Sequence, residues 1–216
     1  MRIFLIRHGH SMQNSKENYE IGLPDNKVYL TEKGRQQAIE AGKFLKEYIV
    51  SHNIDLKNAT MWVSPYERTR ETARLINDYL NVDDVKEDIT LIEQMYGLFS
   101  DKAIELIKPV YPKEFEFYDK YYQNDSKFYA KMPQGESPFD VALRTRQFLE
   151  MITRYDKETV FIISHGTTIR TIIMNYFHYS PEWYNAEPTM DNCSVILIDN
   201  DKEQYIYGGH VKKLKK

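Results

Sequence analysis

Short apolar runs alternate with longer amphipathic segments along this chain. Four of the runs have the length of buried strands: Ile3–Ile6, Thr60–Val63, Val160–Ile163 and Val195–Ile198. The first and third contain no polar residue, which indicates strands covered on both faces. Residues 31–51 form the clearest helix, with Thr31 as its cap and apolar residues at helical spacing: Ala38, Ala41, Leu45, Tyr48 and Ile49.

Three Ser-Pro pairs, Ser64-Pro65, Ser137-Pro138 and Ser180-Pro181, predict further helix starts, with serine as the cap and proline in the first turn. Strands that alternate with helices predict an α/β fold. We expect a three-layer sandwich with a mostly parallel central sheet and helices on both faces. The last apolar segments, Cys193–Ile198 and Gln204–Tyr207, predict a hairpin at one sheet edge, joined by Asp199–Glu203.

Residues 101–137 interrupt this alternation with many aromatic rings among evenly mixed charges. The rings are Tyr111, Phe115, Phe117, Tyr118, Tyr121, Tyr122, Phe128 and Tyr129. We expect a helical, Tyr-rich insertion that acts as a lid within a single domain spanning residues 1–216. Most of its rings are expected to pack against one another, and a minority to line a pocket.

Composition narrows the partners and the compartment. The 29 Lys and Arg residues nearly balance the 32 Asp and Glu residues, so nucleic acid and membrane are not expected partners. No apolar run approaches the roughly 20 residues of a membrane span, and the first run is too short for a secretory signal. Cys193 is the single cysteine, which excludes an internal disulfide. We therefore expect a cytoplasmic protein.

Basic residues follow three of the predicted strands. Arg7-His8-Gly9-His10 follows the first, Ser164-His165-Gly166 follows the third, and Arg68 lies in the first turn of the helix after the second. The carboxyl ends of parallel strands are where α/β sheets bind ligands. Gly9 is expected to let the backbone turn sharply there. Arg7, Arg68, His8 and His165 therefore predict a pocket for an oxyanion such as phosphate.

Other interpretations of these residues stay open at this point. His8 and His10 have the spacing of metal ligands on one face, which is weak evidence for a metal hydrolase. A single histidine at a strand end is more often structural than catalytic. The same fold can also serve as a non-catalytic phospholigand-binding module. The joint occurrence of three basic strand ends favours a catalytic pocket.

The motifs together resemble the histidine phosphatase superfamily, also called the phosphoglycerate mutase-like family. The matching residues run in order over nearly the whole chain: Arg7-His8-Gly9 with Ser11 and Asn14, Ser64-Pro65 with Arg68 and Thr72-Ala73, Leu91-Ile92-Glu93 with Tyr96-Gly97, Gly135-Glu136-Ser137, and Ser164-His165-Gly166. Within the superfamily, the chain looks closest to small phosphoglycerate mutase-like proteins.

This resemblance implies a role for each residue of the site. His8 would be the nucleophile that carries a phosphohistidine, and Glu93 the general acid and base. Arg7, Arg68 and His165 would stabilise the transferred phosphoryl group. The substrate would be bound by Arg7, Asn14, Arg68, Tyr96, His165, Gly166 and Thr167, whereas Glu136 is expected to be structural. No metal or cofactor is implied.

The resemblance also bears on the choice between hydrolysis and isomerisation. Tyr96 stands where the glycolytic mutases also carry tyrosine, but the arginine that neighbours it in those enzymes is replaced by Gln94. Their Gln-Gly-Leu-Asn-Lys stretch is replaced by Phe99-Ser100-Asp101-Lys102. Without those groups a phosphoglycerate would not be retained for re-phosphorylation. We therefore expect a metal-independent phosphatase acting on a small phosphomonoester, with phosphoglycerate mutase-type transfer as the alternative.

Overall fold

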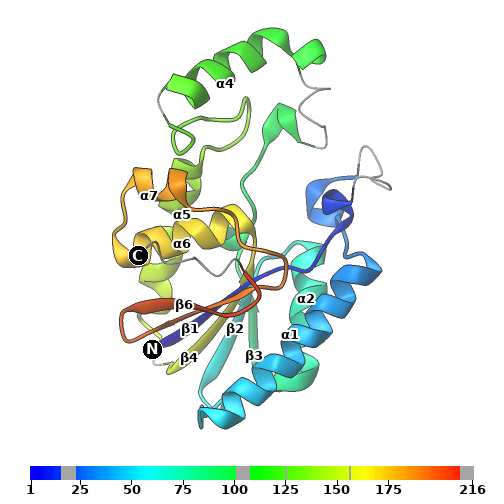
Figure 1. The fold of residues 1–216 in the computed structure, drawn as a ribbon, viewed down its shortest axis with the longest axis vertical. Helices are drawn as coiled ribbons and strands as arrows, with labels where there is room; N and C mark the ends of the chain where they lie inside the picture. Colours follow the sequence, from blue (N-terminus) through cyan, green and yellow to red (C-terminus); the bar gives the residue numbers. More distant parts are fainter. Residues whose placement is uncertain (16–22, 101–107, 125, 156, 210–216) are drawn as a thin grey trace, which may run out of the picture.

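A six-stranded sheet of order β3-β2-β4-β1-β5-β6 forms the centre of the computed structural model (Figure 1). The structure describes residues 1–15, 23–100, 108–124, 126–155 and 157–209. The strands are β1 Arg2–Arg7, β2 Ala59–Val63, β3 Asp84–Glu87, β4 Thr159–Ser164, β5 Val195–Asp199 and β6 Lys202–Tyr207. Strands β3, β2, β4 and β1 are parallel, whereas β5 and β6 are antiparallel to their neighbours. The mostly parallel sheet is as predicted.

Helices lie on both faces of this sheet and beyond one of its ends. The helices of the described residues are α1 Glu32–Ser51, α2 Glu67–Leu80, α4 Pro112–Asn124, α5 Pro138–Ile152, α6 Gly166–Phe177 and α7 Pro181–Ala186. Short 3-10 turns occupy Met12–Asn14, Asp25–Lys27, Ile89–Leu91 and Gly97–Phe99. Helices α1 and α2 pack on one face, and α5 and α6 pack on the other (Figure 1). This arrangement confirms the predicted three-layer α/β sandwich.

Strand β1 shows how the apolar pattern builds the two layers. Phe4 and Ile6 lie in the cluster formed with α1 and α2, whereas Ile3 and Leu5 lie in the cluster formed with α5 and α6. All four side chains are fully buried. Because successive side chains of a strand point to opposite faces, an unbroken apolar run places half of its residues in each layer.

The predicted helix starts have different outcomes. Thr31 caps α1 by accepting a hydrogen bond from the Gly34 N–H, and Ser137 forms a capping box with Asp140 ahead of α5. Ser180 is the N-cap residue of α7, although its side chain makes no capping bond. The prediction for Ser64 was wrong. Helix α2 begins at Glu67, and Tyr66 is its N-cap residue. The Ser64 hydroxyl does not cap the helix, because it is bonded to the ring of His165.

The carboxyl-terminal hairpin is present, but its turn is shorter than predicted. Asn200 and Asp201 form the turn and both have positive φ angles, 48° and 58°. Strand β6 therefore begins at Lys202 instead of Gln204. At the opposite edge, β3 has no counterpart among the predicted strands. Val85 is its single apolar residue and is exposed, so no apolar run marks this strand.

The predicted insertion is helical at 112–124, where α4 lies at the end of the molecule farthest from the sheet (Figure 1). Tyr118 is buried beside Phe99 and Ala130, and Phe128 packs edge-on against Tyr184 with ring centroids 5.2 Å apart. Phe117, Tyr121 and Tyr129 are exposed. Residues 101–107 and 125 of the predicted segment lie outside the described residues, and its function as a lid stays a prediction.

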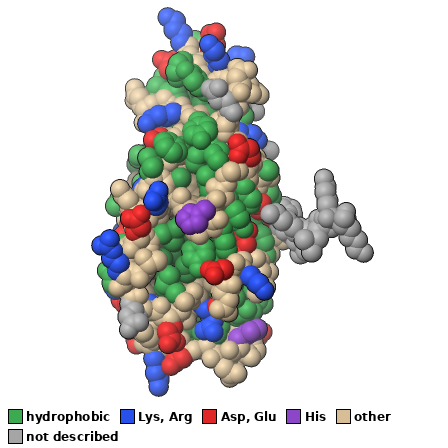
Figure 2. Space-filling model, turned by 90° about the vertical axis from the view of Figure 1, so that its left-hand side faces the viewer, with side chains coloured by type: hydrophobic (Ala, Val, Ile, Leu, Met, Phe, Trp, Pro, Cys, Tyr) green, Lys and Arg blue, Asp and Glu red, His purple; other side chains and the backbone are tan. Residues whose placement is uncertain are grey.

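The surface is unevenly polar. On the face shown in Figure 2, hydrophobic side chains gather in a broad band through the middle, with most of the charged side chains around it. Of the helices in the described residues, none combines the length and the apolar character needed to cross a bilayer.

Two glycines bring the loop after β1 against the start of α1. A Cβ on Gly9 would lie 2.5 Å from the carbonyl oxygen of Gly34, and a Cβ on Gly34 would overlap the carbonyl oxygen of His10. The Thr31 N–H also donates to that His10 oxygen, at 3.0 Å. Gly9 is not among the residues with positive φ. Close backbone approach therefore explains this glycine, and the predicted sharp turn does not.

We expect Gly34→Ala to lower the free energy of unfolding by about 2 kcal/mol, because the added methyl group overpacks the contact with His10. Helix propensity acts in the opposite direction, since alanine favours a helix by about 1 kcal/mol over glycine. Urea unfolding measures the difference. Lys33→Ala, at an exposed neighbouring position, is the control and should change stability by less than about 0.5 kcal/mol. A variant as stable as the parent would contradict the packing argument.

Candidate active site

The pairing of β1 with β4 places two histidines side by side. Arg7 is in register with Ser164, and the His8 N–H donates to the Ser164 carbonyl at 3.0 Å. The rings of His8 and His165 follow, with centroids 5.1 Å apart. Both rings are buried, with 4% and 0% of their surface exposed. The two histidines therefore lie at the carboxyl ends of neighbouring parallel strands.

His8 has one ring nitrogen anchored. Its Nδ1–H donates to the Gly9 carbonyl at 2.8 Å, so the lone pair of a neutral ring lies on Nε2. Burial holds the pKa of His8 well below its usual value, and the positive charges of Arg68 and Arg7 lower it further. His8 is therefore neutral at pH 7 and carries a nucleophilic nitrogen.

His165 is anchored through its other nitrogen. Nε2 lies 2.8 Å from the Ser64 hydroxyl, while Nδ1 is buried without a hydrogen-bond partner. We assign the Ser64 hydroxyl as the donor, so that Nδ1 carries the proton. The Tyr66 ring packs edge-on against His165, with centroids 5.1 Å apart. Burial is the first cause that holds the pKa of His165 well below its usual value, followed by Arg68.

Arg68 is almost completely buried, with 1% of its surface exposed. Its Nη1 donates to the backbone carbonyl of Asp25 at 2.6 Å and to the Asp25 carboxylate at 2.9 Å. The guanidinium also lies over the Tyr66 ring, 4.9 Å from its centroid. Asp25 and Tyr66 were absent from the predicted site. Tyr66 lies two residues before Arg68 in the same motif, and that adjacency is the signal that could have identified it.

Arg7 donates from Nη1 to the carbonyl of Met190 at 2.6 Å. Three buried side-chain atoms of the site lack a hydrogen-bond partner: Arg7 Nε, Arg68 Nε and His165 Nδ1. A buried donor without a partner costs roughly 1–3 kcal/mol. Three such donors around a neutral imidazole form a site that acceptor atoms would satisfy, and the oxygens of an oxyanion have that chemistry.

Glu93 lies at the amino end of α6. Its Oε1 accepts a hydrogen bond from the Gln94 N–H at 2.9 Å, and its Oε2 accepts a longer one from the Thr167 N–H at 3.4 Å. Burial lowers the pKa of Arg7, and the negative charge of Glu93 is the largest of the effects that raise it. Glu93 therefore lies near Arg7, the last residue of β1.

The segment that carries Glu93 is held by side chains. The Ser164 hydroxyl donates to the Leu91 carbonyl at 2.7 Å, and the Thr168 hydroxyl donates to the Ile92 carbonyl at 2.6 Å. The residues on both sides of the β4–α6 junction thus hold the backbone just before Glu93.

A partly buried ion pair supports the same segment from α5. Arg144 donates to both carboxylate oxygens of Glu136, at 3.0 and 3.1 Å, and to the carbonyl of Glu93 at 3.2 Å. Glu136 also accepts from the Met95 N–H. Glu136 thus has the packing environment expected of a structural residue. Arg144 was not predicted, because nothing in its local sequence marks it.

The remaining predicted residues lie around this centre. The Tyr96 hydroxyl hydrogen-bonds with the side chain of Thr167, and burial raises the pKa of Tyr96. A Cβ on Gly166 would lie 3.7 Å from Arg7 Nε. Asn14 is exposed, and its Oδ1 accepts from Asn192, whose amide also donates to the His8 carbonyl. Direct contact of these residues with a substrate stays a prediction.

His10 points to a different partner from His8. Its Nδ1 hydrogen-bonds with the Thr31 hydroxyl at 2.9 Å, whereas His8 Nδ1 is bonded to the Gly9 carbonyl. In the part of the chain that the structure describes, no three His, Cys, Asp or Glu side chains are grouped to hold a metal ion. The hydrogen bonds of these two histidines thus give no support to the metal-hydrolase alternative.

Comparisons with known proteins find related sequences and structures. A model of the histidine phosphatase superfamily (branch 1) matches residues 3–209. The phosphoglycerate mutase-like protein AT74H of Arabidopsis thaliana is 30% identical over 92% of this chain and 73% of its own length. Phosphoserine phosphatase 1 of Hydrogenobacter thermophilus is 30% identical over 80% of this chain and 74% of its own length. The structure of an alpha-ribazole phosphatase from Shigella flexneri superposes with a TM-score of 0.75 at 21% identity, covering 97% of this chain and 96% of the other.

The buried neutral histidines predict a fall in stability on acidification. The pKa of His8 and of His165 is depressed in the folded protein, so the unfolded chain binds more protons as the pH falls below about 6.5. Each histidine then removes up to about 1.4 kcal/mol of the free energy of unfolding per pH unit. Urea unfolding between pH 7 and pH 5 should show a smaller pH slope for His8→Asn than for the parent. His52→Asn, at an exposed position, controls for the substitution, and an unchanged slope in His8→Asn would contradict a buried neutral ring.

Proposed function

Because this chain belongs to the histidine phosphatase superfamily, we propose that it is a metal-independent phosphatase that hydrolyses a small phosphomonoester through a phosphohistidine on His8. The observation that carries the proposal is the set of three unpartnered buried donors, Arg7 Nε, Arg68 Nε and His165 Nδ1, beside that neutral ring. The named phosphatases among the similar proteins are consistent with a small phosphorylated substrate.

In the first step, Nε2 of His8 attacks phosphorus while the bond from phosphorus to the leaving oxygen breaks. The Nδ1–H bond to the Gly9 carbonyl stabilises the positive charge that develops on the ring. The donors of Arg7, Arg68 and His165 bind the oxygens of the transferred phosphoryl group and so stabilise the negative charge that is spread over those oxygens. The two guanidinium groups supply the positive charge that a divalent cation supplies in many other phosphoryl-transfer enzymes.

Glu93 moves the protons of both steps. As a carboxylic acid it protonates the leaving oxygen, and the alcohol departs. As a carboxylate it then takes a proton from a water molecule that attacks the phosphohistidine, which restores His8 and releases orthophosphate. Its place beside Arg7 and the start of α6 supports this role. The residues proposed to bind the remainder of the substrate are Asn14, Tyr96, Gly166 and Thr167.

Hydrolysis is preferred to isomerisation because Gln94 stands where the mutases carry arginine, and its amide donates to the Glu136 carbonyl at 2.7 Å. That neutral amide offers no charge to a substrate carboxylate. The predicted lid function of residues 101–137 and the cytoplasmic location are parts of the same proposal.

We expect His8→Asn to lower kcat for p-nitrophenyl phosphate by roughly a thousandfold or more, because nucleophilic catalysis is lost. Acid quenching of the parent with a ³²P-labelled substrate should trap label on His8, and the variant should trap none. His52→Asn is the matched control, and circular dichroism checks folding. Near-parental turnover in His8→Asn, or activity abolished by EDTA, would contradict the mechanism.

A screen of phosphorylated metabolites scored for isomerisation and for phosphate release separates a mutase from a phosphatase.

We expect Glu93→Gln to impair alkyl phosphates at least tenfold more than p-nitrophenyl phosphate. The nitrophenolate leaving group needs little protonation, whereas an alkoxide does not leave without a proton. The ratio of kcat/KM values for the two substrates, measured in parent and variant, isolates the effect. Glu150→Gln, on the exposed side of α5, is the control. Equal losses on both substrates would argue against Glu93 as the acid.

A further inference from the structure

The segment between β2 and α2 directs alternate side chains to the active site. The Ser64 hydroxyl lies 2.8 Å from His165 Nε2, and Arg68 has a buried Nε without a hydrogen-bond partner. Tyr66 lies between these two residues in the sequence. It is the N-cap residue of α2, but its side chain makes no capping hydrogen bond. The start of the helix therefore does not depend on this side chain.

The Tyr66 ring contacts two of the groups that bind the phosphoryl oxygens in the proposed mechanism. The guanidinium carbon of Arg68 lies over the ring, 4.9 Å from its centroid. The His165 ring meets it edge-on, at an interplanar angle of 69° and a centroid distance of 5.1 Å. His165 in turn lies 5.1 Å from the ring of His8. Tyr66 therefore borders both donors, and His165 separates it from the nucleophile.

The Arg68 guanidinium has two kinds of support. Its Nη1 donates to the backbone carbonyl and to the carboxylate of Asp25, at 2.6 and 2.9 Å. Bonds made by one nitrogen alone leave the guanidinium able to swing about that nitrogen. The Tyr66 ring opposes this movement, because an aromatic face attracts a cation that lies over it, and more strongly where water is excluded. Asp25 and Tyr66 together determine where Nε of Arg68 points.

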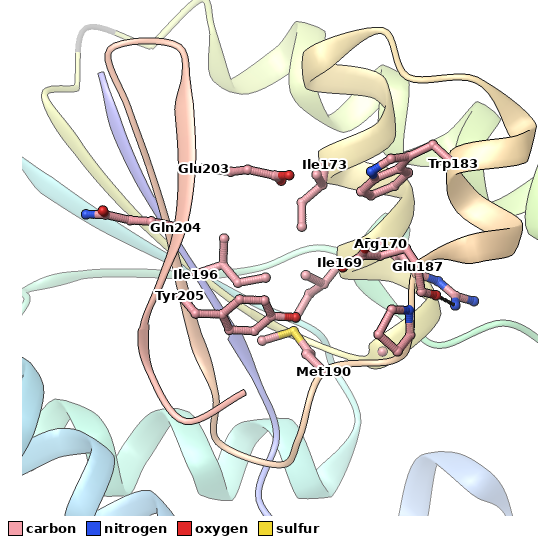
Figure 3. A pocket seen from close by; sticks show the side chains of 12 residues that line it. Ile169, Arg170, Ile173, Trp183, Glu187, Met190, Ile196, Glu203, Gln204 and Tyr205 are labelled. Atoms are coloured by element: carbon pink, nitrogen blue, oxygen red, sulfur yellow. Dashed lines mark hydrogen bonds between the residues drawn. The ribbon is translucent and has the colours of Figure 1, made fainter. Parts of the chain in front are cut away.

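Arg7 is supported by another part of the fold. Its Nη1 donates to the carbonyl of Met190, and Met190 lines a cavity of about 340 Å³ between α6 and the β5–β6 hairpin (Figure 3). Arg7 is therefore held at the wall of a cavity, whereas Arg68 is packed among side chains with 1% of its surface exposed. A change at Tyr66 acts directly on Arg68 and His165 and leaves the support of Arg7 in place.

A neutral ring suits this position better than a charged partner would. Burial raises the pKa of Tyr66 to about 12, and the charge of Asp25 adds to the rise, so the hydroxyl is protonated at pH 7. A second carboxylate beside Arg68 would accept hydrogen bonds from its N–H groups and would compete with an oxyanion for them. An aromatic face holds the guanidinium without occupying any of its N–H groups.

We propose that Tyr66 is a positioning residue for phosphoryl transfer, whose ring fixes Arg68 and His165 so that their unpartnered N–H groups meet the oxygens of the transferred group. This inference rests on the proposed function. Those oxygens reach their final arrangement only in the transition state, so the ring contributes more to binding that state than to binding phosphate. A smaller aliphatic side chain would also admit water beside the two donors, which the oxygens would then have to displace.

Calorimetry with orthovanadate and with inorganic phosphate tests the inference, because orthovanadate adopts the five-coordinate geometry of the transferred group. We expect Tyr66→Leu to weaken orthovanadate binding by about tenfold or more and phosphate binding by about threefold. Tyr66→Phe keeps the ring and should stay within about twofold of the parent for both anions. Tyr79→Leu, at a half-buried position on the same helix, is the matched control. Partial unfolding of a variant lowers the number of binding sites and leaves these dissociation constants unchanged.

A double-mutant cycle with Asp25→Asn tests whether Tyr66 acts through Arg68. The two losses of orthovanadate affinity should differ from their sum, because both residues hold the same guanidinium. Circular dichroism checks folding, and Tyr66→Met replaces Tyr66→Leu if the latter does not fold. Parental affinity in Tyr66→Leu, equal losses in Tyr66→Phe and Tyr66→Leu, or additive losses in the cycle would overturn the inference. Failure of the proposed function looks different, since the parent then binds neither anion.

Discussion

The parallel pairing of β1 with β4 is the constraint on which this site depends. Because Arg7 lies opposite Ser164, the next residue of each strand is a histidine, and the two rings meet at one sheet edge. The Ser64 N–H continues the ladder by donating to the Ile163 carbonyl, which brings the end of β2 to the same place. A shift of one residue in this register would exchange the side chains that β1 places in the two core layers. The register that buries the core side chains of β1 therefore also brings the catalytic groups together.

The site concentrates positive charge on buried arginines, and the partners of these arginines leave some of their N–H groups available to bind an oxyanion. Arg7 and Arg68 each use one nitrogen on backbone carbonyls, and the Asp25 carboxylate is the acidic partner in that set. The Nε atoms of both arginines have no partner. The same two guanidinium groups help to keep both histidines neutral. A chain with a net charge of −3 thus concentrates positive charge at one edge of its sheet.

Local patterns in the sequence predicted the buried strands and the catalytic residues that directly follow them. Apolar runs identified the buried strands, and the Arg-His-Gly and Ser-His-Gly motifs identified two strand ends. The rest depends on partners distant in the sequence. Ser64 was expected to cap a helix, but its hydroxyl is bonded to a residue 101 positions away. Arg144 supports Glu93 from α5, and no spacing rule links those positions. Strand β3 contains no apolar run and joins the sheet only by pairing with β2.

The two halves of the site are held by different means, and α6 joins them. Backbone pairing fixes the nucleophile, whereas Glu93 lies on a segment without regular structure that depends on the hydroxyls of Ser164 and Thr168. Ser164 ends β4, and Thr168 lies in the first turn of α6. His165 lies between them as the N-cap residue, and the Thr167 N–H reaches the Glu93 carboxylate. Together with Arg144, which donates to the Glu93 carbonyl, the five residues 164–168 therefore hold the acid in place relative to the nucleophile, so that a movement of the α6 amino end changes both together.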